Sequence, residues 1–295
     1  RRQRQMCIRD RGLDNDIFCF NVESAVELEI INELAAAKNK VASIALRINP
    51  EVDAHTHAKI TTGMKENKFG INLSQLGGVL DKLKEMKHVK LIGIHSHIGS
   101  QITDMSSFRN LVIRFNEIQE ELEAHGVTVE NLNFGGGLGI DYYHPNHLSI
   151  PAFDNYFAAI HKLLQVRPGQ QVHFEPGRSI VAQCGTLISK VLYVKEGETK
   201  KFAILDAGFT ELIRPAMYDA YHRIENISSD EAVETYDVVG PICESSDVFG
   251  KDVELNKAHR GDLIALRSAG AYGEVMASQY NCRHLPKAYY SDTIK

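Results

Sequence analysis

The sequence predicts an α/β protein: a partial (β/α)8 barrel of the TIM type, with about five of its eight strands present, followed by an antiparallel β domain. Over the first part of the chain, short apolar runs alternate with longer amphipathic stretches. Strands that alternate with helices require right-handed crossovers and therefore form a parallel sheet. From about Gly185 the pattern changes to short β-branched runs broken by Gly, Asp and Pro, which is typical of an antiparallel β domain.

The elements of the barrel follow one another as strand and then helix. Apolar runs predict strands at 17–24, 41–50, 88–100, 129–139 and 171–183. Amphipathic helices are expected after the first four of them, within 25–40, 74–87, 106–126 and 150–169. Polar and glycine residues gather at the carboxyl ends of the last three strands, where barrels of this type build their sites. The alternative, an open five-stranded sheet, is disfavoured because no GxGxxG opens its first helix.

The domain organisation follows from this count. Three βα units, roughly 100 residues, are expected before Leu13 of an intact barrel, so the sequence is interpreted as an N-terminally truncated fragment. The first eleven residues hold five arginines and one acid, and we expect residues 1–12 to be a non-native or disordered basic tail. Residues 13–185 are assigned to the partial barrel and residues 186–295 to the β domain.

Composition limits the partners and the compartment. The 295 residues are 43% hydrophobic and 24% charged, as in an ordinary globular protein, and the net charge of −5 favours neither nucleic acid nor an anionic membrane. No membrane-length apolar run and no secretory leader is seen, so the cytoplasm is expected. The five cysteines are scattered and never form CxxC, which argues against a disulfide framework and against structural zinc. Cys243 is therefore expected to be a free thiol.

Two groups of residues at strand ends suggest the binding of anions. The glycines at 135–137 expose consecutive backbone N–H groups that suit a phosphate, although such a loop is as often only a tight turn. Glu175, one strand later, can pair with a protonated ring nitrogen, and Arg178 can hold a carboxylate by its bidentate fork. The alternative is an ion pair between Glu175 and Arg178 at the barrel rim.

Two further patterns allow more than one interpretation. His95 and His97 form an HxH pair, which opens the zinc site of some barrel hydrolases, or one of the two rings could stack on a flat cofactor. Later zinc ligands are poorly placed, which disfavours metal. Arg214 and Tyr218 are four residues apart and become neighbours if their segment is a helical turn. Such a pair binds carboxylates well but is also common on surfaces.

Six segments together carry a resemblance to a known family. In chain order they are HSHIGSQI, NFGGGLG, HFEPGR, RPAMYDAYH, GPICESSD and SAGAYG. From about Asp14 to its end the chain resembles the fold-type III decarboxylases that depend on pyridoxal 5'-phosphate. RPAMYDAYH and CESSD narrow the resemblance to members that convert meso-diaminopimelate to L-lysine and CO2 in lysine biosynthesis. The first alternative is a related decarboxylase of carboxynorspermidine or of a basic amino acid. The second is a non-catalytic homologue that binds the cofactor.

The resemblance implies a role for each matching residue. His97 would stack on the pyridine ring, and Glu175 would pair with the ring nitrogen. The residues expected to hold the cofactor phosphate are Ser100, Gly135, Gly136, Gly137, Gly177 and Arg178. The residues expected to contact the substrate are Arg178, Arg214, Tyr218, Glu244 and Tyr272, of which Tyr272 also touches the cofactor. Metal is not implied.

Cys243 is expected to return a proton to the substrate carbon after CO2 leaves. A thiol with a pKa of about 8.5 is mostly protonated at pH 7, and the neighbouring Glu244 and Asp247 favour an acid over a nucleophile. In this family Cys243 and Glu244 act in the site of a second subunit, so a homodimer is implied. The cofactor-binding lysine of the family, in a Tyr-Ala-x-Lys-Ala-Asn-like context, has no counterpart here. The fragment itself is therefore expected to be inactive.

Overall fold

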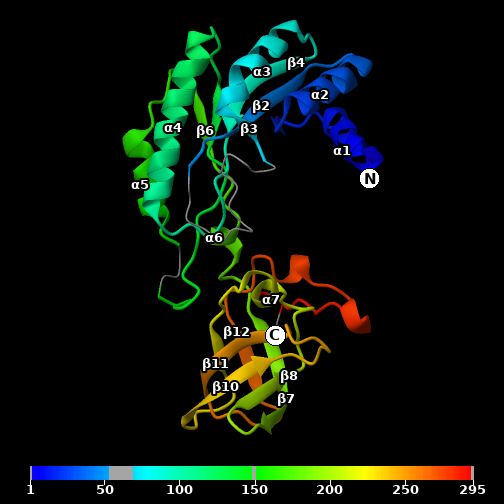
Figure 1. The fold of residues 1–295 in the computed structure, drawn as a ribbon, viewed down its shortest axis with the longest axis vertical. Coiled ribbons are helices and arrows are strands. Elements are labelled where there is room, and N and C mark those ends of the chain that lie inside the picture. The colour runs from blue at the N-terminus through cyan, green and yellow to red at the C-terminus, as the bar shows by residue number, and fades with distance from the viewer. Residues whose placement is uncertain (1, 53–68, 148–150, 294–295) are drawn as a thin grey trace. The chain divides into compact units, whose positions relative to one another are not determined.

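The computed structural model describes residues 2–52, 69–147 and 151–293, with side chains from Ile8 onward (Figure 1). The chain forms two compact units, each described here by itself. The first comprises Arg1–Leu138 and Ala152–Pro176, and the second comprises Gly139–Pro151 and Gly177–Lys295. Arg1 of the predicted tail, Ile150 of a predicted helix and 294–295 of the predicted β domain lie outside the described residues.

The first unit is built on a parallel sheet. Its strands are β1 (Phe20–Val22), β2 (Ala42–Asn49), β3 (Ile71–Asn72), β4 (Val89–His95), β5 (Asn131–Asn133) and β6 (Gln171–His173). They are arranged in the order β1-β2-β4-β5-β6, with β3 paired to β2, and every pairing is parallel. Strands that pair in sequence order are what successive βα units of a barrel produce. The five predicted strands are therefore present, and the two-residue β3 is an addition.

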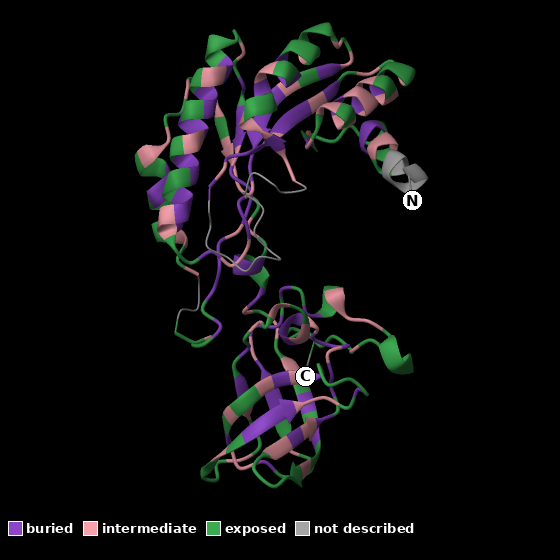
Figure 2. Cartoon of the chain, in the orientation of Figure 1, coloured by how far each residue is buried: buried purple, intermediate pink, exposed green. Residues whose placement is uncertain are grey.

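The helices of the first unit are α1 (Arg2–Asp14), α2 (Ala25–Ala37), α3 (Leu73–Glu85), α4 (Met105–Ala124) and α5 (Phe153–Leu163). Side-chain caps begin two of them: Ser24 Oγ accepts from the Glu27 N–H of α2, and Asp104 accepts from the Ser106 N–H of α4. The buried residues of α4 lie along one side of the helix (Figure 2). Among them Phe115 stacks on Phe134, with ring centroids 4.1 Å apart. Phe134 directly precedes the glycine loop at 135–137.

Two sequence predictions differ from the structure. The strand expected at 171–183 ends at His173, and Arg178–Val181 forms the short helix α6 instead. The apolar run Ile180–Ala182 is too short for its periodicity to separate strand from helix. The segment 1–12 was expected to be a non-native or disordered basic tail; it is helical from Arg2, and Arg9 forms an ion pair with Glu27 of α2. Its native or non-native origin stays a prediction.

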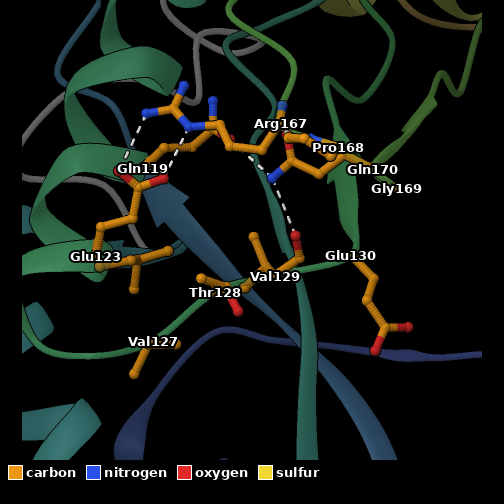
Figure 3. Close-up of a pocket in the computed structure, with 11 residues that line it drawn as sticks. Gln119, Glu123, Val127, Thr128, Val129, Glu130, Arg167, Pro168, Gly169 and Gln170 are labelled. Carbon is orange, nitrogen blue, oxygen red and sulfur yellow. Dashed lines mark hydrogen bonds and ion pairs between the residues drawn. The ribbon is translucent and has the colours of Figure 1, made fainter.

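A pocket of about 390 Å³ lies beside the carboxyl-terminal half of α4 (Figure 3). Gln170 Nε2 donates to Gln119 Oε1 at 2.8 Å and to the Val129 carbonyl at 2.9 Å. Arg167 Nε donates to Glu123 at 2.7 Å. These contacts tie α4 to the turns that precede β5 and β6, at the amino ends of the strands. Residues at that end of a β/α barrel stabilise the fold, so we assign the pocket no catalytic role.

The second unit is a mostly antiparallel β domain. Its strands are β7 (Leu187–Glu196), β8 (Lys201–Leu205), β9 (Ile224–Asn226), β10 (Val233–Val239), β11 (Val248–Asn256) and β12 (Leu263–Leu266). They form one sheet in the order β11-β10-β8-β7-β12-β9, and only the β10–β8 pair is parallel. Four short helices of the described residues also belong to this unit: α6, α7 (Arg214–Tyr218), η1 (Glu274–Met276) and η2 (Tyr280–Cys282).

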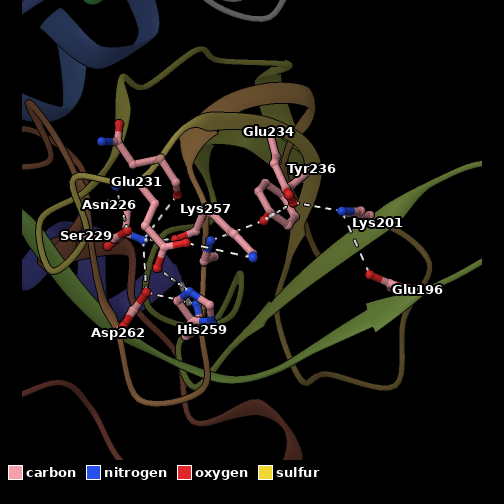
Figure 4. A network of polar contacts seen from close by, with 12 residues as sticks. Glu196, Lys201, Asn226, Ser229, Glu231, Glu234, Tyr236, Lys257, His259 and Asp262 are labelled. Atoms are coloured by element: carbon pink, nitrogen blue, oxygen red, sulfur yellow. Dashed lines mark hydrogen bonds and ion pairs between the residues drawn. The ribbon is translucent and has the colours of Figure 1, made fainter.

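A network of polar contacts fixes the connection between β11 and β12 (Figure 4). Tyr236 is buried in the core, and its hydroxyl donates to Glu234 at 2.7 Å and accepts from the Ala258 N–H at 3.1 Å. Asp262 accepts from Asn226 Nδ2 at 3.0 Å and from the His259 N–H at 2.8 Å. Because these groups lie on separate strands and loops, the network holds the edges of the sheet together.

Within the described residues, none of the helices combines the length and apolar character that a bilayer crossing demands.

Candidate active site

Three loops of the first unit meet at the carboxyl ends of β4, β5 and β6. The glycine loop after β5 packs too tightly for side chains: a Cβ on Gly135, whose φ is +64°, would lie 2.5 Å from the Ser96 carbonyl oxygen. A Cβ on Gly136 would lie 2.3 Å from the Glu175 carbonyl oxygen. Only glycine permits this approach of three backbones. The structure therefore brings the predicted residues His97, the glycines at 135–137 and Glu175 to one rim of the sheet, as the order of the strands implies.

Glu175 is held in place by two side chains. Its Oε1 accepts from Asn133 Nδ2 at 2.9 Å, and its Oε2 lies 3.4 Å from His95 Nε2. Asn133 also accepts from the Gly135 N–H at 2.9 Å, so it links the carboxylate to the glycine loop. The contact with His95 is the main cause that lowers the pKa of Glu175 to about 2. Glu175 is thus an ionised, half-exposed carboxylate at neutral pH, able to accept a further hydrogen bond.

His97 is neutral and has a defined tautomer. Its Nδ1 accepts from the Gly136 N–H at 3.2 Å, which places the ring proton on Nε2. Burial, aided by the charges of Arg47 and His95, lowers the pKa of His97 to about 4. A neutral, half-buried imidazole suits stacking on a flat ring. Ser100 lies three residues after His97, in the loop that follows β4, and is half-buried.

The two histidines of the HxH pair have separate contacts, to Glu175 for His95 and to Gly136 for His97. Within the described part of the chain, no group of three or more His, Cys, Asp or Glu side chains is arranged to hold a metal ion. Buried His95 Nδ1 has no hydrogen-bond partner among the described residues. An ionised acceptor, a neutral ring and a tight glycine loop together fit a phosphorylated, ring-shaped cofactor with a basic nitrogen.

In the second unit a cluster forms around Tyr142. Arg178, the first residue of α6 after Gly177, donates from Nη1 to the Tyr142 hydroxyl at 2.6 Å. The Arg214 guanidinium lies over the same ring, 4.9 Å from its centroid. The guanidinium of Arg178 also lies 5.0 Å from the centre of the Tyr272 ring. The structure therefore brings together three of the predicted substrate-binding residues, Arg178, Arg214 and Tyr272, around a tyrosine to which the sequence assigned no role.

Arg214 begins α7, the helical turn that the spacing of Arg214 and Tyr218 requires, and Tyr218 is its last residue. Arg214 Nη1 donates to His222 Nε2 at 2.7 Å, and His222 Nδ1 donates to the Arg267 carbonyl at 2.8 Å. His222 closes the segment RPAMYDAYH, yet no sequence signal separated it from an ordinary core histidine. The contact shows that His222 belongs to the cluster that Arg178 and Arg214 form around Tyr142.

Cys243 and Glu244 lie in the loop between β10 and β11. The thiol of Cys243 is free and exposed, and Glu244 accepts from the Tyr280 hydroxyl at 2.7 Å. Asp247 is buried, and its carboxylate accepts from the Ile242 N–H at 2.7 Å and the Phe209 N–H at 2.6 Å. Burial raises the pKa of Asp247. Its carboxylate thus binds backbone amides, including one of its own loop, and fixes the loop that presents Cys243.

Acid should destabilise the second unit through His222. Burial is the main cause that lowers the pKa of His222 to about 4. The hydrogen bond to the Arg267 carbonyl opposes this shift, and the positive charges of Arg214 and Arg178 add to it. Below pH 6.5 the unfolded chain binds a proton that the folded chain does not, so stability falls as the pH falls toward 4. Between pH 6.5 and 5 we expect a loss of roughly 2 kcal/mol. Urea unfolding followed over this range should show a smaller loss in His222→Gln, which lacks the titrating group, and equal slopes would contradict the assignment.

Comparison with known proteins identifies the family. The model of the pyridoxal-binding domain of pyridoxal-dependent decarboxylases matches residues 5–182, and the chain belongs to this family. A diaminopimelate decarboxylase of Bacteroides thetaiotaomicron is 66% identical over 283 residues, which cover 96% of this chain and 73% of that protein. One from Haemophilus influenzae is 44% identical, over 92% of this chain and 65% of its own length. Within the family, the chain belongs with the diaminopimelate decarboxylases.

The crystal structure of the Helicobacter pylori diaminopimelate decarboxylase with L-lysine superposes with a TM-score of 0.86 at 39% identity. The match covers 94% of this chain and 68% of that one. The predicted fold class, a β/α barrel followed by a β domain, is confirmed by this likeness. Pyridoxal phosphate, the cofactor inferred from the sequence, is the cofactor of the matched domain. It also agrees with the neutral ring, the ionised carboxylate and the glycine loop of the first unit.

Proposed function

We propose that the full-length protein decarboxylates meso-diaminopimelate to L-lysine and CO2 with pyridoxal 5'-phosphate. The observation that favours this substrate is the pair of buried arginines, Arg178 and Arg214, because diaminopimelate keeps a second carboxylate and amino group at its far end. A basic amino acid or carboxynorspermidine would leave such a pair without that carboxylate. We place this activity in the cytoplasm. Residues 13–185 carry the cofactor-binding part of the barrel, and 186–295 carry the β domain.

Most of the residues that hold the cofactor in this proposal belong to the first unit. The N–H groups of the loop 135–137, together with Ser100 and the backbone of 177–178, bind its phosphate. His97 stacks on its ring with a neutral imidazole, which costs less to desolvate than a cation. Glu175 accepts a hydrogen bond from the ring nitrogen and stabilises its protonated form, because the carboxylate stays charged at neutral pH. When bound, the cofactor supplies an electron sink for the pair released with CO2.

Residues of the second unit hold the substrate and move the proton. Arg178 and Arg214 grip the far carboxylate, Tyr218 and Tyr272 flank it, and Glu244 binds the far amino group. Cys243 returns a proton to the carbon that loses CO2. An exposed thiol on a loop fixed by a buried carboxylate is suited to enter a neighbouring subunit. We therefore propose a homodimer in which Cys243 and Glu244 act in the partner's site.

The activity test compares substrates on the full-length protein. We expect CO2 release from meso-diaminopimelate at least about 100-fold faster than from lysine or carboxynorspermidine, because those compounds leave a charged site unpaired. The 295-residue chain itself is expected to show no turnover, since no lysine of it matches the family's cofactor-binding lysine. Release of labelled CO2 is the measurement, and preference for another substrate would favour the alternative decarboxylases. A full-length protein that binds cofactor but releases no CO2 from any of them would favour a non-catalytic homologue.

A further inference from the structure

His95 and Asn133 occupy equivalent positions on neighbouring strands of the first unit. They are Cα partners in the β4–β5 pair, so their side chains project from the same face of the sheet. Asn133 is paired in turn with His173 of β6, and Glu175 lies two residues beyond His173. The register therefore gathers a histidine, an amide and a carboxylate at the carboxyl ends of three adjacent strands.

Each oxygen of the Glu175 carboxylate is held by one of the two side chains. Asn133 Nδ2 donates to Oε1 at 2.9 Å, and His95 Nε2 lies 3.4 Å from Oε2. Because an ionised carboxylate only accepts hydrogen bonds, the His95 ring carries a proton on Nε2. The amide of Asn133 is also fixed, since its oxygen accepts from the Gly135 N–H at 2.9 Å and its nitrogen must then face Glu175.

Neither donor removes the charge of the carboxylate. His95 is 3% exposed, and its Nδ1 has no hydrogen-bond partner among the described residues. A second proton on this ring would be a buried donor without an acceptor, so the neutral ring is the form that fits the site. Asn133 is uncharged, and no lysine or arginine of the described first unit forms an ion pair with Glu175. Glu175 is thus oriented while its negative charge stays available.

We propose that His95 is a positioning residue that, together with Asn133, holds Glu175 as an oriented, ionised acceptor for the ring nitrogen of the cofactor. The proposal rests on the proposed role of Glu175. Without these donors a half-exposed glutamate samples several rotamers, and ordering it again costs binding free energy. A preorganised partner avoids this cost. His95 therefore acts on the cofactor through Glu175.

The first test compares two amides at position 95 of the full-length protein. His95→Gln places an amide N–H where Nε2 donates to Glu175, whereas the shorter side chain of His95→Asn does not reach the carboxylate. In His95→Asn we expect pyridoxal phosphate to bind the apoprotein about 10- to 100-fold more weakly, as for loss of a hydrogen bond to a charged group. Its kcat should fall at least about 10-fold, with the KM for meso-diaminopimelate within about threefold. His95→Gln should lie within about threefold of wild type throughout.

A double-variant cycle decides whether His95 acts through Glu175. In the Glu175→Gln background the charge that His95 orients is absent, so adding His95→Asn should weaken cofactor binding by less than about a further threefold. Titration of the apoprotein with pyridoxal phosphate, followed by absorbance, is the measurement. Full additivity of the two losses would overturn the proposal, and so would wild-type cofactor binding in His95→Asn.

A measurement on the wild-type apoprotein applies even where His95→Asn does not fold. Nitrogen NMR at about pH 8 should show the His95 ring neutral and protonated on Nε2, and this signal should shift in Glu175→Gln. A ring protonated on Nδ1 would overturn the proposal.

His173→Asn is the matched control, because His173 lies in the same row of paired residues but its Nε2 contacts Asn131, at 2.8 Å. It should leave cofactor binding and kcat within about threefold of wild type, and losses as large as those of His95→Asn would show that any histidine of this row has the same effect and would overturn the proposal. A wild-type protein that binds the cofactor but does not decarboxylate meso-diaminopimelate would instead overturn the proposed function, and the binding cycle would still decide the role of His95.

Discussion

Replacing Cys243 with alanine in the full-length protein is expected to lower kcat by about 100- to 10,000-fold, the range for loss of a positioned proton donor. The thiol is exposed on the loop between β10 and β11, so its removal leaves no cavity in the core. Binding of meso-diaminopimelate depends on other side chains and should stay within about threefold. Single-turnover kinetics, which separate binding from chemistry, provide the measurement.

Cys184→Ala is the matched control, because Cys184 is also a free, exposed thiol of the second unit. It should retain full activity. A Cys243→Ala variant that loses binding and turnover equally would show that the residue holds the substrate rather than protonates it.

A mixed dimer tests where Cys243 acts. Neither Cys243→Ala nor Glu175→Gln homodimers should turn over appreciably. If the thiol serves the partner's site, a heterodimer of the two variants contains one site with both residues intact. An equal mixture after subunit exchange should recover about a quarter of the wild-type activity, since half of the dimers are mixed and each has one intact site. No recovery would place Cys243 in the site of its own subunit.

The two longest strands of the first unit, β2 and β4, could be predicted from sequence because they are mostly buried and apolar over a length that periodicity can detect. The eight residues of β2 lie within the predicted 41–50, and the seven of β4 within 88–100. Two short elements, β3 and α6, were not predicted. The two residues of β3 and the four of α6 are fixed by neighbouring chain segments, and no local pattern of that length distinguishes a helix from a strand.

The residues of the candidate site also form two groups, those that could be predicted from sequence and those that could not. Residues that follow strands could be located, because parallel strands deliver their carboxyl ends to one edge. Their partners could not, since Asn133 and His95 lie 42 and 80 residues from Glu175, and Tyr142 lies 36 from Arg178. Asp247 was predicted to be an acidic neighbour of the thiol, but its carboxylate is buried on backbone amides. Sequence proximity alone does not reveal the direction of a side chain.

Replacing Glu175 with glutamine is expected to lower kcat by at least about 100-fold, the effect of removing a preorganised electrostatic partner of the reacting group. His95 and Asn133 hold the carboxylate, and its pKa of about 2 keeps it negative throughout the neutral range. An amide carries no charge and cannot stabilise a protonated ring nitrogen to the same degree. A bound cofactor would then accept electrons less readily, although the residues that would hold its phosphate and ring are unchanged.

The measurement that isolates this role is the absorbance of bound cofactor as a function of pH, in wild type and Glu175→Gln. The variant should bind the cofactor about 10- to 100-fold more weakly than wild type, because the loss of one hydrogen bond to a charged group is of this order. Its ring nitrogen should lose its proton at lower pH. Glu123→Gln, which removes an exposed carboxylate paired with Arg167 beside the pocket of Figure 3, should change neither the spectrum nor kcat. Unchanged titration of the ring in Glu175→Gln, together with wild-type kcat, would show that another group stabilises the protonated nitrogen.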